Sequence, residues 1–78
     1  MQITLFYKPT CPYCLKVLHY LKQNNITVPL KDVSAEERTK QELIQIGGKS
    51  QVPCLVIDGK ALYESDDIIK WFKTQGQR

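Results

Sequence analysis

The sequence predicts a single α/β domain, residues 1–78, in which three helices flank a four-stranded mixed sheet. Two observations support this prediction. Short apolar runs alternate with segments of helical periodicity, in the order β-α-β-α-β-β-α. The last two apolar runs are joined by Asp58-Gly59, a strong signal for a two-residue hairpin. A chain of this size buries only about 60% of its unfolded surface, so we expect one small core.

The first strand and the first helix enclose the most distinctive stretch of the chain. The strand is predicted over Gln2–Tyr7, and it is too apolar for simple alternation. It should therefore be a central strand that is buried on both faces. The helix is predicted from Pro12 to about Asn24, because proline is tolerated best at the first helical position. Its apolar side consists of Cys14, Val17, Leu18 and Leu21.

The next two elements are a short strand and a second helix. The strand is predicted around Val28–Val33, at a distance that permits a parallel crossover. The pattern from Ser34 to Glu37 predicts a capping box, with serine as the N-cap and glutamate at the third helical position. The helix should end at Gly47-Gly48, since glycine adopts the left-handed conformation at little cost. Its expected anchors are Leu43, Ile44 and Ile46.

The C-terminal part is predicted to form a hairpin and a last helix. The two strands of the hairpin are Cys54–Ile57 and Lys60–Tyr63. Ser65 is expected to cap the helix, and Asp66 and Asp67 in its first turn complement the positive end of the helix dipole. Its apolar side consists of Ile68, Ile69, Trp71 and Phe72.

Composition excludes several classes of function. The net charge is only +3, and the 11 basic residues are dispersed among 8 acidic ones, so we expect no nucleic-acid partner. No segment is long and apolar enough for a membrane span, and the N-terminus has no signal-peptide pattern. Three cysteines cannot all pair within one chain. These features predict a protein of a reducing compartment, the cytoplasm, without a membrane partner.

The C-x-x-C pair, Cys11 and Cys14, carries the predicted chemistry. Cys11 precedes the first helix, where free N–H groups and the helix dipole favour a thiolate over a thiol, and Lys8 adds a positive charge. Cys14 lies one turn inside the helix. We therefore predict thiol–disulfide exchange, with Cys11 as the attacking sulfur and Cys14 as the resolving one. A zinc site is disfavoured because only Cys54 and His19 remain as further ligands, so we predict no metal.

Three motifs together resemble those of the glutaredoxins. They are Cys11-Pro12-Tyr13-Cys14 after the first strand, Val52-Pro53 before the third, and Ser65-Asp66-Asp67 at the last helix. The resemblance covers nearly the whole chain and implies a thioredoxin-like (glutaredoxin) fold. One difference is that Tyr63-Glu64 stands where glutaredoxins usually carry a Gly-Gly pair. The run Leu62-Tyr63-Glu64-Ser65 resembles instead the Glu-Ser element of glutathione-transferase N-terminal domains.

The resemblance also implies one end of a glutathione site. Val52-Pro53 would have a cis peptide bond facing the two cysteines, and the Val52 backbone would pair with the cysteinyl residue of glutathione. The alternative is a trans proline that simply starts the strand. Lys8 and Lys40 would lie near the glycine carboxylate, and Tyr13 would flank the groove.

The other end of the site would bind the γ-glutamyl residue. By the same resemblance, the backbone amides of Ser65 and Asp66 would hold its carboxylate at a helix N-terminus. Asp67 would take the ammonium, or Glu64 if the transferase analogy is the better one.

We therefore predict a glutathione-dependent thiol–disulfide oxidoreductase. It would act as a monomer on protein disulfides or glutathione mixed disulfides, with glutathione as the reducing co-substrate and no permanently bound cofactor. The alternative is a glutathione-binding or iron–sulfur-carrier module with little reductase activity. Cys54 is expected to be either a small buried hydrophobe or a regulatory site of glutathionylation.

Overall fold

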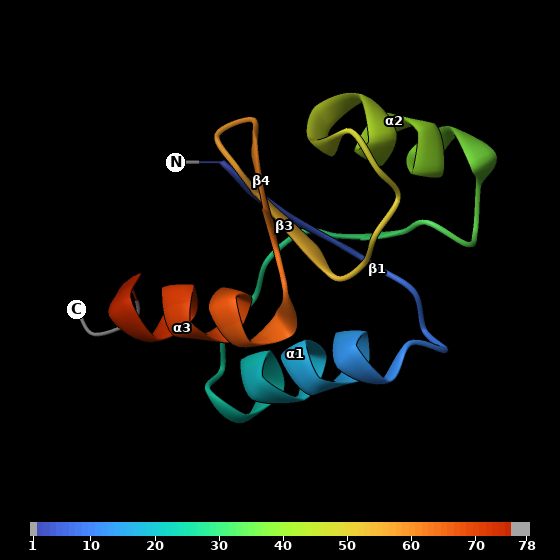
Figure 1. Ribbon diagram of the computed structural model, residues 1–78. Coiled ribbons are helices and arrows are strands. Elements are labelled where there is room, and N and C mark those ends of the chain that lie inside the picture. The colour runs from blue at the N-terminus through green and yellow to red at the C-terminus, as the bar shows by residue number, and fades with distance from the viewer. Residues whose placement is uncertain (1, 76–78) are drawn as a thin grey trace.

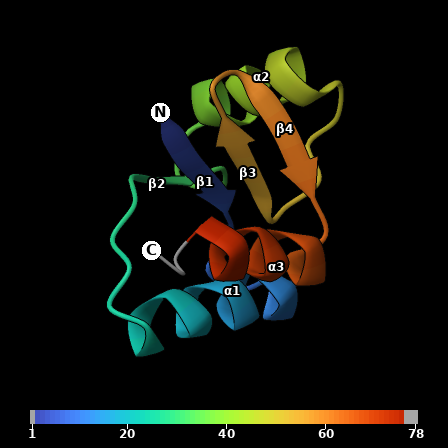
Figure 2. The ribbon, with the colours of Figure 1, turned by 90° about the vertical axis from the view of Figure 1, so that its left-hand side faces the viewer.

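The computed structural model describes residues 2–75, in which four strands form one mixed sheet in the order β2-β1-β3-β4. Helices α1 and α3 cover one face of this sheet and α2 covers the other (Figures 1 and 2). This is the predicted thioredoxin-like architecture. The elements are β1 (Ile3–Tyr7), α1 (Pro12–Gln23), β2 (Leu30–Asp32), α2 (Glu37–Gly47), β3 (Cys54–Ile57), β4 (Lys60–Tyr63) and α3 (Ser65–Gln75).

Strand β1 lies in the middle of the sheet, as predicted. It pairs in parallel with β2, where Leu5 is opposite Leu30, and antiparallel with β3, where Leu5 is opposite Leu55. Successive side chains of a strand point to opposite faces, and both Leu5 and Phe6 are buried. The uninterrupted apolar character of this strand therefore reflects burial on both sides of the sheet.

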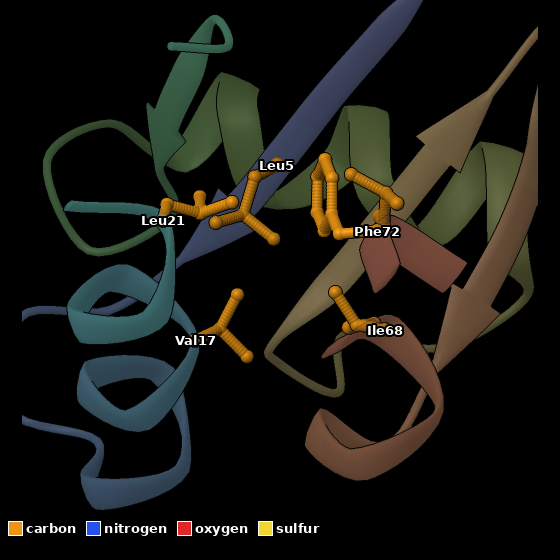
Figure 3. Close-up of a cluster of buried hydrophobic side chains, with 6 residues drawn as sticks. Leu5, Val17, Leu21, Ile68 and Phe72 are labelled. Atoms are coloured by element: carbon orange, nitrogen blue, oxygen red, sulfur yellow. The ribbon is translucent and has the colours of Figure 1, made fainter. Parts of the chain in front are cut away.

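Each face of the sheet has its own hydrophobic cluster. On the α1/α3 face, side chains from the sheet and both helices converge, as Figure 3 shows for Leu5, Val17, Leu21, Ile68 and Phe72. The cluster under α2 consists of Phe6, Val33, Leu43, Cys54 and Val56. Cys54 is thus a fully buried member of this second cluster. Among residues 2–75, no helix has the length and apolar character needed to cross a bilayer.

The predicted capping box at the start of α2 is wrong. The N-cap is Glu36, which makes no side-chain capping hydrogen bond, and the helix begins at Glu37. Ser34 is engaged elsewhere, because its Oγ and its backbone N–H both donate to Asp32 Oδ1, at 2.6 and 2.8 Å. This interaction holds the pKa of the Asp32 carboxyl below its usual value. The Ser34 hydroxyl, which the sequence predicted to cap α2, therefore donates instead to the aspartate at the end of β2.

Three other predicted boundaries shift. β1 begins at Ile3 and β2 covers only Leu30–Asp32, since Leu30 is the first residue of this segment that pairs with β1. The prediction that Ser65 caps α3 is also wrong. The helix begins at Ser65, and its first hydrogen bond runs from the Ile68 amide to the Glu64 carbonyl, so Glu64 occupies the N-cap position.

Two local features accommodate the Tyr63-Glu64 pair: the absence of a side chain at Gly47 and a left-handed backbone conformation at Glu64. Gly47, at the end of α2, has no side chain where the Tyr63 ring packs, and a Cβ added there would overlap the Tyr63 hydroxyl. Glu64 has a φ of 74°, the left-handed conformation that glycine adopts at least cost. The backbone at Glu64 is therefore one that glycine would favour, with a carboxylate side chain added.

Candidate active site

Cys11 and Cys14 lie at the N-terminal end of α1, as predicted. Cys11 is the N-cap, Pro12 occupies the first turn, and Cys11 Sγ accepts a hydrogen bond from the Cys14 amide at 3.4 Å. The sulfur of Cys11 thus faces an amide that has no partner within the helix. Cys11 is partly exposed, whereas Cys14 is fully buried, and both are free thiols. The two sulfurs differ sharply in their access to a substrate.

The burial of Cys14 also changes its acidity. Burial raises the pKa of the Cys14 thiol from its ordinary value of 9.0 to about 12. The Cys11 side chain adds to this rise, while the Lys8 amide and ammonium oppose it. Cys14 is therefore protonated at neutral pH, and a thiol is a much weaker nucleophile than a thiolate. Cys14 is unsuited to make the first attack on a disulfide.

The Val52–Pro53 peptide bond is cis, which confirms the expectation and excludes the trans alternative. The Cys11 thiol points toward the Val52 carbonyl oxygen, 3.9 Å from Sγ. Pro53 is buried and directly precedes β3. The segment before β3 and the loop before α1 therefore meet at the exposed cysteine.

One pocket beside Val52, here called the α2 pocket, has a volume of about 330 Å³. Lys8, which follows β1, and Lys40, from the first turn of α2, both line it. Two ammonium groups on one pocket favour an anionic group of a ligand. The remaining lining residues are Val33, Ser34, Glu37 and Ser50.

A second pocket, here called the α3 pocket, also includes Val52 in its lining and has a volume of about 390 Å³. It is lined by Tyr13, Gln51, Val52, Pro53, Glu64, Ser65 and Asp66. Tyr13 is 65% exposed, so the face of its ring is available to a ligand. The first backbone amides of α3, which lack partners within the helix, lie at this pocket. Val52 therefore lines both pockets, and its carbonyl oxygen is the group that Cys11 Sγ approaches.

The predicted glutathione-binding residues, with one exception, line the α2 pocket or the α3 pocket, whereas Cys11 and Cys14 line neither. The exception is Asp67, which is exposed on the first turn of α3 and is not among the residues that line the α3 pocket. The sequence did not single out Gln51 or Lys16. Gln51 Nε2 donates to Glu64 Oε2 at 3.1 Å, and Lys16 forms an ion pair with Asp66. The one sequence feature that could have indicated a role for Gln51 is its position directly before Val52-Pro53.

A wider pocket, of about 760 Å³, lies between β2 and α2. Its lining includes Lys31 and Glu42, which form an ion pair at 2.9 Å, and none of the three cysteines. We assign the chemistry to the α2 pocket and the α3 pocket instead, because both are lined by Val52, whose carbonyl oxygen lies 3.9 Å from Cys11 Sγ.

The family model described as Glutaredoxin matches residues 3–62 of the chain. The chain belongs to the glutaredoxin family. It is 33% identical over 60 residues to an uncharacterized glutaredoxin-like 8.6 kDa protein in the rubredoxin operon of Clostridium pasteurianum, a match that covers 77% of this chain and 80% of the relative. Family membership and the site geometry support a glutaredoxin-like thiol oxidoreductase.

Solved structures agree with this assignment. Wheat glutaredoxin superposes with a TM-score of 0.71 at 25% identity, over 94% of this chain and 72% of the wheat chain. Glutathione transferase Omega 3C from Trametes versicolor gives a TM-score of 0.83 at 26% identity, over 97% of this chain. The match covers 34% of that longer transferase chain. This glutaredoxin fold is therefore close to that of part of a transferase, in line with the Glu-Ser element noted in the sequence.

Proposed function

We propose that the chain is a glutathione-dependent thiol–disulfide oxidoreductase that reduces protein disulfides and glutathione mixed disulfides through Cys11 and Cys14. One observation carries the proposal. A partly exposed sulfur at the open end of α1 lies beside a buried, protonated one, and it is 3.9 Å from the carbonyl oxygen of Val52, the residue that lines both pockets. Glutathione is the reducing co-substrate, and no cofactor is held permanently. We expect the protein to act as a monomer in the cytoplasm.

The reaction begins when the Cys11 thiolate attacks one sulfur of a substrate disulfide. The new Cys11–S bond forms as the substrate S–S bond breaks, and the other substrate sulfur leaves as a thiolate that takes up a proton. Cys14 then gives its proton to water and attacks Cys11, which releases the second substrate thiolate. Two electrons have passed from the dithiol to the substrate. Two glutathione thiols return them: the first opens the Cys11–Cys14 disulfide, and the second releases glutathione disulfide.

For a glutathione mixed disulfide the same site can work without Cys14. Cys11 takes the glutathionyl group and the substrate thiolate leaves; a second glutathione then attacks the glutathione sulfur and frees Cys11. The Cys14 sulfur stays a protonated spectator in this route. Its raised pKa suits that role, because an ionised neighbour would compete for the mixed disulfide.

The charges of the two pockets match the charges of glutathione. In the proposal, Lys8 and Lys40 of the α2 pocket bind the glycine carboxylate. The amides of Ser65 and Asp66 bind the γ-glutamyl carboxylate at the start of α3. The Val52 backbone pairs with the cysteinyl residue between them, beside cis-Pro53, and Tyr13 covers its side. The similarity to a glutathione transferase supports the same class of ligand.

Replacing Cys14 by Ser is expected to separate the two routes. Reduction of a glutathionylated peptide should stay within about threefold of the parent, because it needs only Cys11. Reduction of an intramolecular peptide disulfide should fall by at least about tenfold, because no second thiol resolves the intermediate. Both rates are followed with glutathione and glutathione reductase as the coupling system. A parent protein that reduces neither substrate while still binding glutathione would favour the binding-module alternative and end this proposal.

A further inference from the structure

Helix α1 has an exposed side that neither glutathione pocket includes. Leu15 is 49% exposed and lines neither the α2 pocket nor the α3 pocket. Residues four and seven positions further along a helix lie on the same side of it, and here they are His19 and Lys22, both exposed. Helix α1 lies along the lower edge of the molecule in both ribbon views (Figures 1 and 2). The surface formed by Leu15, His19 and Lys22 is called the α1 stripe below.

The α1 stripe begins next to the exposed sulfur. Leu15 follows Cys11 by about one helical turn, and its amide donates to the Cys11 carbonyl at 3.0 Å. A helical side chain leans toward the N-terminus and covers the turn that precedes it. The Leu15 side chain therefore covers the turn that begins at Cys11. A substrate that is bonded to Cys11 and extends along α1 reaches Leu15 first.

The charges on α1 are all positive, because none of its residues is acidic. Lys16 is already matched by Asp66 of α3. Lys22 forms no ion pair within residues 2–75. The α1 stripe thus offers an apolar contact near the sulfur and an unmatched positive charge further away. At 1.5 Å of rise per residue, Leu15 lies about 6 Å and Lys22 about 16 Å from Cys11 along the helix axis.

These separations determine what kind of molecule can use the α1 stripe. An extended polypeptide advances about 3.3 Å per residue. Its second residue from a cysteine bonded to Cys11 therefore reaches Leu15, and its fifth residue reaches Lys22. Glutathione has a single residue on each side of its cysteine, so it is too short to reach Lys22. The complementary ligand is a longer polypeptide, with an apolar side chain at the second position and a carboxylate at the fifth.

We propose that the α1 stripe binds the polypeptide of protein substrates and selects cysteines that have an apolar residue two positions away and an acidic residue five positions away. The inference rests on the proposed function, because it names the class of protein that the same sulfur reduces. Leu15 and Lys22 are then specificity residues for the protein substrate, and they take no part in binding glutathione.

The test uses two glutathionylated peptides. One has leucine two positions and glutamate five positions from its cysteine, on both sides, so that the direction of the chain does not matter. The other has serine and glutamine at these positions. We expect the parent to reduce the leucine–glutamate peptide with a kcat/KM about tenfold higher, which corresponds to about 1.4 kcal/mol. The rates are followed with glutathione and glutathione reductase.

Leu15→Ser should lower this preference from about tenfold to about threefold and leave KM for glutathione within about twofold, because glutathione does not reach this side chain. Leu30→Ser is the matched control. Leu30 is 48% exposed but lies on β2, and its replacement should keep the full preference. A preference that survives in Leu15→Ser, or that Leu30→Ser lowers equally, would overturn the assignment of Leu15.

Charge reversal tests the far end of the α1 stripe. Lys22→Glu should lower kcat/KM for the leucine–glutamate peptide about threefold and raise it for a peptide with lysine in place of glutamate. Lys60→Glu, at the exposed hairpin of β3 and β4, is the control and should change neither rate. A Lys22→Glu protein with the preference of the parent would contradict the charge contact.

The inference and the proposed function fail in different ways. A parent that reduces both peptides equally well has no α1 stripe selectivity, and this result refutes the inference while the proposed function stands. A parent that reduces neither peptide refutes the proposed function.

Discussion

Replacing Cys11 by Ser is expected to abolish glutathione-dependent disulfide reduction, with a loss of at least about a hundredfold, because a hydroxyl is not ionised at neutral pH and cannot replace a thiolate. The structure gives no other cysteine the same access. Cys14 and Cys54 are both fully buried, and burial raises the pKa of each thiol. The measurement is the rate of reduction of a glutathionylated peptide, with the folded state of the variant verified by circular dichroism.

Cys54→Ala provides the matched control for this experiment. Cys54 lies in the cluster beneath α2 and lines neither the α2 pocket nor the α3 pocket. Its removal should leave the rate within about twofold, because no step of exchange uses its sulfur. If Cys11→Ser kept substantial activity, or if a folded Cys54→Ala protein lost it, the attacking sulfur would have been wrongly assigned.

Gly47→Ala is expected to destabilise the fold by about 1–3 kcal/mol, even though alanine favours a helix over glycine, because the new methyl group overpacks a filled site. Its Cβ would overlap the Tyr63 hydroxyl, approach Tyr63 Cζ to 2.9 Å and lie 3.2 Å from Ala61 Cβ. Tyr63 cannot easily move aside. Its hydroxyl donates to the Lys49 carbonyl at 3.2 Å, and the Lys49 ammonium lies 4.5 Å from the ring centroid. Urea unfolding of the reduced protein measures the loss.

Two further variants identify the cause of that loss. Gly48→Ala tests backbone strain alone, because Gly48 has a φ of 83° and open space around its Cα, and it should cost about 1 kcal/mol. Tyr63→Phe removes the overlapping oxygen, so in combination with Gly47→Ala it should recover part of the lost stability. A Gly47→Ala protein as stable as the parent would mean that α2 does not pack on β4 as described.

Much of the fold could be predicted because local signals agreed with long-range packing. The apolar run of β1 predicted a central strand, Asp58-Gly59 a tight turn, and Pro12 the start of α1, and each is confirmed. The capping box failed for a physical reason. Ser34 had two possible kinds of partner, the helix amides and the Asp32 carboxylate, and in the structure its hydroxyl donates to Asp32. A short-range pattern cannot decide between partners that a strand end brings together.

In the candidate site too, some features could be predicted from local sequence patterns and others could not. The cysteine pair and the residues around Val52-Pro53 follow from spacing and from the family resemblance. The ion pair of Lys16 with Asp66 and the hydrogen bond of Gln51 with Glu64 do not, because they join residues far apart in the chain. Lys16 and Asp66 are separated by 50 positions, and Gln51 and Glu64 by 13. Which acidic side chain of α3 pairs with Lys16 depends on how α1 packs against α3, and no local pattern contains that information.

The assignment of Cys11 as the attacking sulfur is tested most directly by mapping which sulfur captures glutathione. The reduced Cys14→Ser protein is mixed briefly with less than one equivalent of glutathione disulfide, quenched with acid, alkylated and analysed by peptide mass spectrometry. The proposed chemistry predicts glutathione on Cys11 in nearly all modified molecules and on Cys54 in almost none. Capture mainly by Cys54, or equally by both sulfurs, would contradict it.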